Sequence, residues 1–272
     1  MTQFTDQTVI VTGAGSGIGY GFCKRFAERG ATVALNDLDA NLAGQAAAKI
    51  NTEIGRQAVY PYTGDMSDPD TIFSFVEAVS AQHGPPHIAI ANAGLSQYVR
   101  FLECTPETFD KVTNLNLRGS YFLAQAAAKQ MIAHKIRGRI ILLSSVVGIR
   151  AFPNFSVDGM TKAGLQMMAS MLALELGTTG ITVNAISPGA ILTERTQRQD
   201  PKYAENWGSV SPNGRVGYVE DIVNTALFLC APESSHVTGQ NITVDGGWTL
   251  PGVLPDEHPE LPLDEVDQHS DT

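Results

Sequence analysis

The sequence has few cysteines, few basic residues and no long apolar run. Its three cysteines are widely separated in 272 residues, which argues against a disulfide framework and suits a reducing compartment such as the cytoplasm. Lysine and arginine number 18 against 28 acids, giving a net charge of −10, and such a surface does not attract nucleic-acid phosphates. No apolar segment reaches the roughly 20 residues of a membrane span, and no basic-then-apolar signal peptide is visible. We therefore expect no nucleic-acid partner and no membrane segment.

Histidine is also scarce, and the six histidines show no paired spacing of the kind that holds a metal ion, so we expect no metal site. Hydrophobic residues make up 43% of the chain, which is enough for a substantial core. Residues 251–272 contain seven acids and no Lys or Arg. We predict one domain over 1–250 and an acidic, proline-rich tail over 251–272. The composition favours a mobile solubilising tail; the alternative is an arm that packs on a neighbouring subunit through Leu254, Leu261, Leu263 and Val266.

Apolar runs and helical patterns alternate along the chain to about residue 245. Several runs, such as 140–143, are apolar throughout, which is typical of parallel strands buried on both faces. The alternation predicts a single doubly wound α/β domain of the Rossmann type, with about seven parallel strands and helices on both faces. The expected strands are 8–12, 31–36, 57–61, 87–91, 138–144, 181–186 and 240–244. The expected helices are 17–29, 39–54, 68–83, 106–135, 155–178 and 218–230. The long gap 187–217 is interpreted as an irregular lid or substrate loop.

The most informative motif directly follows the first expected strand. Glycines occupy positions 13, 15, 17 and 19; without Cβ atoms such a backbone can approach a pyrophosphate at the N-terminus of the next helix. The second expected strand ends at Asp37, roughly the 20-residue distance expected for a carboxylate that binds the ribose hydroxyls of a dinucleotide. No Lys or Arg lies between Ala31 and Asn41. We therefore expect NAD rather than NADP.

Small or polar residues follow nearly every expected strand. Because the carboxyl ends of parallel strands share one edge of a sheet, we expect these residues to surround a ligand crevice. Asp65 is expected to reach an adenine amino group. The segments are Gly64–Met66, Asn92–Gly94, Asn114–Gly119, Ser144–Gly148, Lys162 and Ser187–Gly189.

These motifs make the chain resemble the classical short-chain dehydrogenase/reductase family over roughly residues 6–248. The matching segments are Thr12–Gly19, Asn92–Gly94, Asn116, Ser145, Lys162, Pro188–Gly189 and Asp245–Gly247. The resemblance implies NAD as cofactor and a small-molecule substrate that is a secondary alcohol or ketone of the sugar, polyol or oxoacyl type. It also implies a homo-oligomer, expected to be a tetramer, built through the helices 106–135 and 155–178.

The resemblance also implies roles for individual residues. Ser145 would hold the substrate oxygen, Lys162 would bind the nicotinamide ribose, and Asn116 would support a water relay. NAD would be held by Gly13, Ser16, Gly17, Ile18, Gly19, Asp37, Leu38, Asp65, Met66, Asn92, Ala93, Gly94, Lys162, Pro188, Gly189, Ile191 and Thr193.

One position departs from the family's pattern. Its proton-transfer residue is a tyrosine 13 positions after the serine and 4 before the lysine, and counting from Ser145 or Lys162 leads to Asp158. Aspartate titrates near about 3.9 and tyrosine near about 10, and Lys162 would lower the pKa of Asp158 further unless burial outweighs it. An ionised carboxylate is a much weaker base than a phenolate, and it opposes negative charge on a neighbouring oxygen.

Three functions remain open at this point. The chain is an NAD-dependent dehydrogenase with an altered acid–base group, an NAD-binding subunit with weak catalysis, or an enzyme that uses Asp158 as the base of a non-redox reaction. Tyr98 and Tyr203 are candidate substitutes for the missing phenol, although packing in substrate loops is the simpler interpretation. An anionic group of a substrate would be met near the mouth of the site by Arg100, Arg150 or Arg195.

Overall fold

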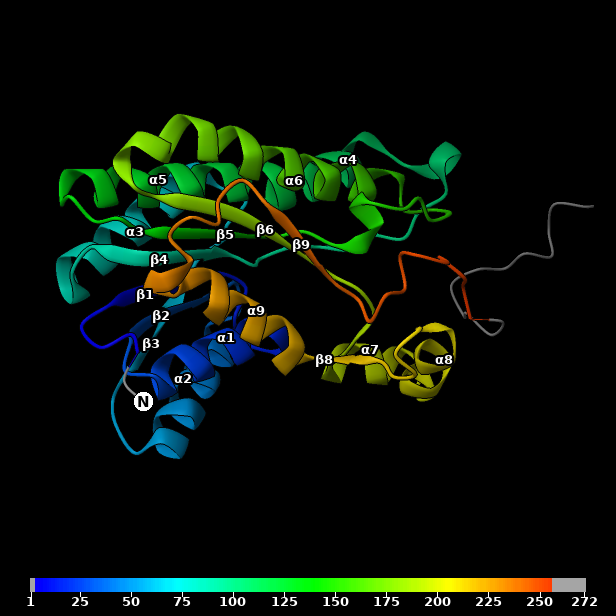
Figure 1. Ribbon diagram of the computed structural model, residues 1–272, viewed down its shortest axis with the longest axis horizontal. Helices are drawn as coiled ribbons and strands as arrows, with labels where there is room; N and C mark the ends of the chain where they lie inside the picture. The colour runs from blue at the N-terminus through cyan, green and yellow to red at the C-terminus, as the bar shows by residue number, and fades with distance from the viewer. Residues whose placement is uncertain (1–2, 256–272) are drawn as a thin grey trace, which may run out of the picture.

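The computed structural model describes residues 3–255, and it confirms the predicted doubly wound α/β domain (Figure 1). Seven strands form one parallel sheet in the order β3-β2-β1-β4-β5-β6-β9. They are β1 (Thr8–Val11), β2 (Thr32–Asp37), β3 (Val59–Thr63), β4 (Pro86–Ala91), β5 (Arg139–Leu143), β6 (Thr182–Pro188) and β9 (Asn241–Val244). Each strand lies within two residues of the range expected from the sequence.

Helices cover both faces of this sheet (Figure 1). One face carries α1 (Gly17–Glu28), α2 (Ala40–Ile54) and α9 (Val219–Cys230), and the other carries α3 (Pro69–His83), α5 (Ser120–Ala133) and α6 (Ser156–Leu176). Side chains of the strands contribute to two separate buried clusters: Val9 and Val11 belong to the first, and Ile10 belongs to the second. Successive side chains of a strand point to opposite faces of the sheet, and helices bury both faces. For this reason the strands are apolar throughout. None of the described helices is long and apolar enough to cross a membrane.

The prediction of a single helix over 106–135 is wrong in detail. The chain instead forms α4 (Pro106–Thr113), a π-helical segment (Asn114–Gly119) and then α5. The wider turn directs Asn116 inward, where its side chain is buried. Segments of this kind are often found at functional sites. Periodicity does not reveal them, because one extra residue in a turn barely changes the apolar pattern.

The segment 187–217, expected to be irregular, contains ordered elements. β7 (Ile191–Leu192) pairs with β8 (Gly217–Tyr218) in parallel, and α7 (Glu194–Gln199) and α8 (Tyr203–Val210) lie between them. In Figure 1 these helices form a lobe beside the sheet. Arg215, at the end of the lobe, donates to both carboxylate oxygens of Asp221 on α9 at 2.7 and 2.8 Å. The role of the lobe as a lid stays a prediction.

The first residues of the predicted tail pack on the domain. Trp248 donates from Nε1 to the carbonyl oxygen of Val253 at 2.7 Å, and Leu254 packs against the cluster that contains Trp248. The domain boundary at residue 250 stays a prediction. The remaining tail lies outside the described residues, and so do the proposed contact residues Leu261, Leu263 and Val266.

Candidate active site

The strand order reverses at β1, which lies between β2 and β4. Crossovers leave the sheet in opposite directions at such a point, and this opens a crevice at the carboxyl ends of the strands. A cavity of about 520 Å³, here called the nucleotide cavity, lies along this edge. Its lining includes every residue that the sequence assigned to the nucleotide: Gly13, Ser16, Gly17, Ile18, Gly19, Asp37, Leu38, Asp65, Met66, Asn92, Ala93, Gly94, Lys162, Pro188, Gly189, Ile191 and Thr193.

Close backbone packing explains the glycines of the first turn. Gly13 has a φ of 59°, and a Cβ on it would lie 2.7 Å from the Cα of Ala93. A Cβ on Gly19 would lie 2.5 Å from the Gly13 carbonyl oxygen. Asn92 donates from Nδ2 to the carbonyl oxygens of Thr12 and Gly13 at 2.9 and 2.7 Å. The end of β4 therefore fixes the turn, and side chains would push the two apart.

Helix α1 presents its N-terminus to the nucleotide cavity. Ser16 is the N-cap in an extended conformation, and its side chain makes no capping hydrogen bond. Ser16 and the first helical residues, 17–19, all line the cavity, and the first turn contains no acid. N–H groups left without a capping side chain, together with the helix dipole, bind phosphate groups. These features fit the pyrophosphate of a dinucleotide.

Asp37 lies in the lining of this cavity and also shapes the glycine turn. Its Oδ2 accepts from the N–H of Gly15 at 2.9 Å, and its Oδ1 accepts from the N–H of Asp39 at 3.1 Å. The carboxylate is thereby held in one orientation while further lone pairs remain for a ligand. Asp65 is held similarly, because its Oδ1 accepts from the N–H of Ser67 at 2.8 Å.

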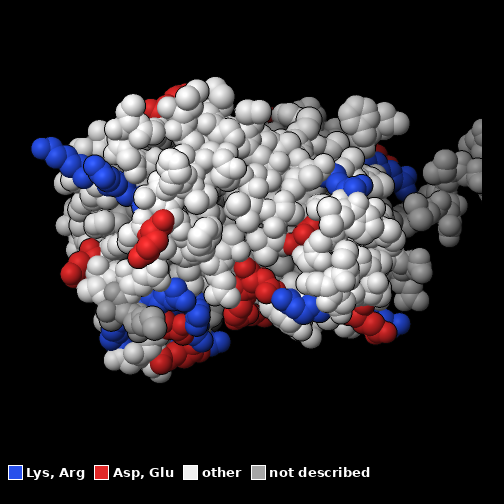
Figure 2. All heavy atoms as spheres, viewed as in Figure 1, with Lys and Arg blue, Asp and Glu red and all other residues white. Residues whose placement is uncertain are grey.

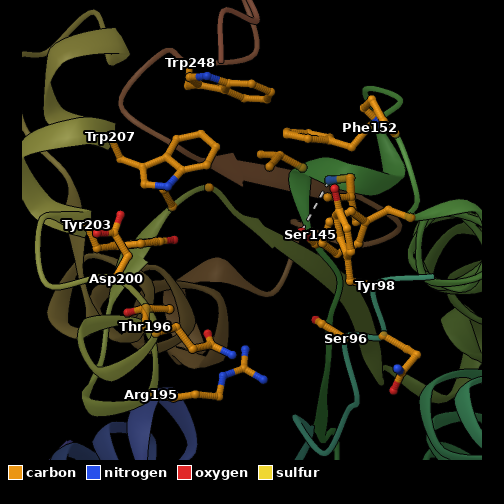
Figure 3. A pocket seen from close by; sticks show the side chains of 18 residues that line it. Ser96, Tyr98, Ser145, Phe152, Arg195, Thr196, Asp200, Tyr203, Trp207 and Trp248 are labelled. Atoms are coloured by element: carbon orange, nitrogen blue, oxygen red, sulfur yellow. Dashed lines mark hydrogen bonds between the residues drawn. The ribbon is translucent and has the colours of Figure 1, made fainter. Parts of the chain in front are cut away.

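A second cavity of about 400 Å³, here called the substrate cavity, adjoins the first. Aromatic side chains form much of its wall. Phe152 stacks on Trp248 with ring centroids 5.1 Å apart, and Trp207 meets Trp248 edge-on at 5.9 Å. Figure 3 shows the two indoles toward one end of this space and Arg195 at the other. The cavity therefore offers an apolar wall for a ring or chain and a cation near its opposite end.

The two candidate phenols lie on facing walls of the substrate cavity (Figure 3). The hydroxyl of Tyr98 accepts from Asn154 Nδ2 at 3.0 Å, and its ring meets Phe155 edge-on at 5.2 Å. Tyr203 begins α8, and its ring centroid is 6.1 Å from that of Trp207. Both rings thus contribute packing to the wall, and a proton-transfer role for either stays a prediction.

The two cavities meet at a small group of residues, here called the junction. Ser145 directly follows the end of β5, and its Oγ accepts from the N–H of Val147 at 3.3 Å, which leaves the hydroxyl hydrogen able to point toward a ligand. A nicotinamide in the first cavity and a substrate in the second would come together here. The shared lining residues are Ser96, Ser145, Gly189, Arg195, Thr196 and Tyr203.

Asp158 lies behind the junction, in the first turn of α6. Its side chain is 2% exposed, and within the described chain it lines neither cavity. Asn116 donates from Nδ2 to Asp158 Oδ1 at 3.2 Å and to Thr161 Oγ1 at 3.1 Å. The π-helical segment therefore brings Asn116 against the residue that replaces the family's tyrosine. A carboxylate is shorter than a phenol by the length of a ring, which accounts for its recessed position.

Burial dominates the electrostatics of Asp158. Loss of water raises the pKa of this carboxyl above its usual range, against the opposing effects of Lys162, Ser96 and Arg195. Lys162 is itself buried, its Nζ donates to the Leu143 carbonyl oxygen at 3.0 Å, and burial lowers the pKa of its ammonium group. Lys162 does favour the ionised form of Asp158, but desolvation is the larger effect, so burial outweighs the lysine at this position. Asp158 therefore stays protonated up to a higher pH than an exposed aspartate does.

The three arginines expected at the substrate mouth occupy different places. Arg195 lines both cavities. Arg150 instead donates to the carbonyl oxygens of residues 249 and 250 and holds the C-terminal segment. Arg100 is exposed and forms an ion pair with Glu103 at 3.6 Å. Of the three, Arg195 is the one placed to meet a substrate.

Sequence reasoning missed part of the lining. Arg198 on α7 lines the nucleotide cavity, although no cation occurs near Asp37 in the sequence. Ser96 lines both cavities, although no motif in the sequence includes it. Neither carries a local signal, because each is placed by the path of a long loop. Further lining residues without such a signal are Asn36 and Glu194.

Comparisons with known proteins identify the relatives of this chain. A family model described as enoyl-(acyl carrier protein) reductase matches residues 13–249. The chain is 35% identical over 243 residues to the 3-oxoacyl-(acyl-carrier-protein) reductase FabG of Chlamydia trachomatis, covering 89% of this chain and 97% of that protein. It is 36% identical over 245 residues to the L-rhamnose-1-dehydrogenase of Scheffersomyces stipitis, covering 89% and 95%.

Solved structures give the same result. A short-chain type dehydrogenase/reductase from Mycobacterium marinum matches with a TM-score of 0.85 and 30% sequence identity, over 91% of this chain and 97% of that chain. These relatives are named as dehydrogenases and reductases. The chain belongs to the short-chain dehydrogenase/reductase family.

Proposed function

We propose that this protein is an NAD(H)-dependent oxidoreductase that interconverts a secondary alcohol and a ketone in a small molecule of the sugar, polyol or oxoacyl type. One observation supports this most strongly. The residues assigned to the nucleotide line a single cavity, and this cavity meets an aromatic substrate cavity at Ser145. The three cysteines are free, which is consistent with the cytoplasmic location that we propose.

The chain's own residues divide the work around the bound cofactor, which would accept or supply a hydride at the carbinol carbon. The N-terminus of α1 would bind the pyrophosphate, and Asp37 the adenosine ribose. Lys162 would bind the nicotinamide ribose from its buried position beside Gly94. Ser145 would donate a hydrogen bond to the substrate oxygen and fix it at the junction.

The choice of NAD over NADP rests on the charge of Asp37. A carboxylate accepts hydrogen bonds from both ribose hydroxyls and repels a 2′-phosphate. Arg198, which also lines the nucleotide cavity, acts in the opposite direction. Its Nε donates to the Glu194 carbonyl oxygen at 3.1 Å, so part of its hydrogen-bonding capacity is already used. We therefore propose NAD as the preferred cofactor.

A second candidate function is an NAD-binding subunit with weak catalysis. The recessed position of Asp158 favours it, because a carboxyl that is 2% exposed does not touch a substrate in the cavity directly. The same observation gives no support to Asp158 as the base of a non-redox reaction, which would need direct contact with the substrate.

Binding and turnover separate these candidates. Calorimetry with NADH and NADPH measures cofactor binding, and NADH oxidation with a panel of ketones and sugars measures turnover for the native protein and for Asp158→Tyr. The proposed function predicts NADH binding and turnover in the native protein. Tight NADH binding without turnover in either form would support the binding subunit instead. A protein without affinity for either nucleotide would refute both.

The proposed homo-oligomer has a suitable surface on α6. Four apolar side chains there lie at helical spacing and are 50–79% exposed: Met160, Met167, Met171 and Leu174. In Figure 2 the upper surface, over α5 and α6, carries few charged side chains. Apolar residues on the outer face of a helix indicate a second protein surface. We propose a tetramer assembled through these helices, and light scattering should show Leu174→Glu at a smaller assembly mass than the native protein.

A further inference from the structure

The buried carboxyl of Asp158 has a neighbour that reaches the junction. Asn116, which donates to Asp158, also binds the backbone just after β4: its Oδ1 accepts from the N–H of Leu95 at 2.7 Å, and its Nδ2 donates to the Leu95 carbonyl oxygen at 3.0 Å. This double contact fixes the backbone directly before Ser96, and the Ser96 side chain forms a hydrogen bond with the Asp158 carboxyl. Ser96 is itself exposed and lines both cavities.

The hydroxyl groups of Thr196 and Ser145, which also line the junction, form hydrogen bonds with nearby backbone groups. The Thr196 hydroxyl donates within its own turn, to the carbonyl oxygens of Ile191 and Thr193 at 3.1 Å each. Ser145 follows the neighbouring strand β5, where its Oγ accepts from the backbone of Val147. Ser96 thus combines contact with the cavities and proximity to Asp158.

We propose that Ser96 and Asp158 together replace the missing tyrosine: the Ser96 hydroxyl passes a proton between the reacting substrate oxygen and the buried carboxyl. This inference rests on the proposed function, because it supplies the proton that accompanies hydride transfer. Figure 3 shows Ser96 on the side of the substrate cavity that carries Tyr98 and Ser145, across from Arg195.

The proton balance is simple in both directions. During ketone reduction, Ser96 Oγ gives its proton to the substrate oxygen and takes one from the protonated Asp158 carboxyl. Asp158 then regains a proton from water through Ser96 once the product has left. During alcohol oxidation the substrate hydroxyl gives its proton to Ser96 Oγ, whose own proton passes to the Asp158 carboxylate. Burial favours the protonated carboxyl that reduction needs, so this route is compatible with the electrostatics of the site.

Charged groups on the same helix and on a neighbouring helix also act on Asp158. Lys162 on α6 and Arg195 on α7 both favour the ionised carboxylate, and so do hydrogen bonds from Ser96 and Asn116. Removing the Ser96 hydroxyl therefore removes one stabiliser of the anion and should raise the pKa of Asp158. This prediction concerns the protein without cofactor or substrate.

The first experiment compares two serine variants in two backgrounds. In the native background Ser96→Ala should lower kcat for ketone reduction by about 10- to 100-fold, whereas Ser96→Thr, which keeps a hydroxyl, should recover most of the loss. In the Asp158→Tyr background, Ser96→Ala should lower kcat for ketone reduction by less than about threefold, because the phenol reaches the substrate directly. The neighbouring lining variant Gln97→Ala is the matched control, and its effect should fall on KM rather than kcat.

The second experiment measures the titration of the Asp158 carboxyl. Infrared difference titration, with Asp158→Asn to identify the band, should show a higher pKa for Asp158 in Ser96→Ala than in the native protein. An equal loss of kcat in both backgrounds, or an unchanged carboxyl titration, would overturn the relay and leave the proposed oxidoreductase intact. A complete lack of turnover in the native protein and in Asp158→Tyr would instead overturn the proposed function and the relay with it.

Discussion

The nucleotide cavity and the centre around Asp158 lie side by side at one sheet edge, yet they depend on the sequence in different ways. The nucleotide cavity is built from backbone: glycines 13 and 19 allow contacts that any Cβ would block, and α1 presents N–H groups. The centre around Asp158 is built from one carboxyl whose behaviour depends on burial. Backbone requirements are local, whereas a protonation state is set by everything packed around it.

The largest effect should come from restoring the phenol. Asp158→Tyr should raise kcat for ketone reduction by about 100-fold, the lower range for a positioned acid–base group, because tyrosine would reach the junction directly. Steady-state kinetics with NADH and the ketone panel measure this. A rate no higher than that of the native protein would mean that the centre is not limited by its acid–base group.

A change in the nucleotide cavity should act on binding instead. Gly13→Ala forces a Cβ to 2.7 Å from Ala93 at a φ of 59°, and we expect NADH affinity to fall by about 100-fold, or roughly 2.7 kcal/mol. Gly44→Ala is the matched control. No atom lies within 4 Å of that Cβ, so calorimetry should find its affinity unchanged, and its helix should gain up to about 1 kcal/mol.

The charge of Asp37 offers a finer test of the same cavity. Asp37→Asn keeps an oxygen that can accept from the Gly15 N–H, now 2.9 Å from Oδ2, but it no longer repels a 2′-phosphate. We expect the ratio of NADP to NAD affinity to rise by about tenfold, or roughly 1.4 kcal/mol. Competitive binding measurements would detect this, and an unchanged ratio would show that another group, such as Arg198, decides cofactor choice.

The smallest effect concerns stability and its dependence on pH. A carboxyl whose pKa is raised on folding contributes stability that is fully present below the unfolded pKa, about 3.9, and lost as pH rises through the folded pKa. Asp158 is such a group. Urea unfolding across this window should find Asp158→Asn gaining about 1 kcal/mol on the native protein as pH rises. A difference that does not vary with pH would contradict the burial effect.

The sequence was sufficient for the parts of the molecule that repeat a local pattern. All seven strands of the main sheet follow from apolar runs, and the residues that line the nucleotide cavity follow from the motifs at the strand ends. The π-helical segment at Asn116 was not predictable, because the apolar period passes through it almost unchanged. The lobe over 187–217 was not predictable either, since its strands are only two residues long and pair across the whole segment, Ile191 with Gly217 and Leu192 with Tyr218.

The departure at position 158 was visible in the sequence, but its consequence was not. Sequence spacing placed Asp158 next to Lys162, and an ion pair would lower the pKa of the carboxyl. In the structure Lys162 donates to the Leu143 carbonyl oxygen, and the carboxyl lies almost without contact with water. Which effect prevails depends on burial, and burial depends on the loop after β4 and on the π-helical segment.

The most direct test of this account is the rate of ketone reduction by Asp158→Ala at neutral pH, beside the native protein and with NADH binding verified for both. Removing the carboxyl should lower kcat by at least about tenfold while NADH affinity stays the same. Rapid reduction that persists unchanged in the alanine variant would show that the carboxyl takes no part in proton transfer.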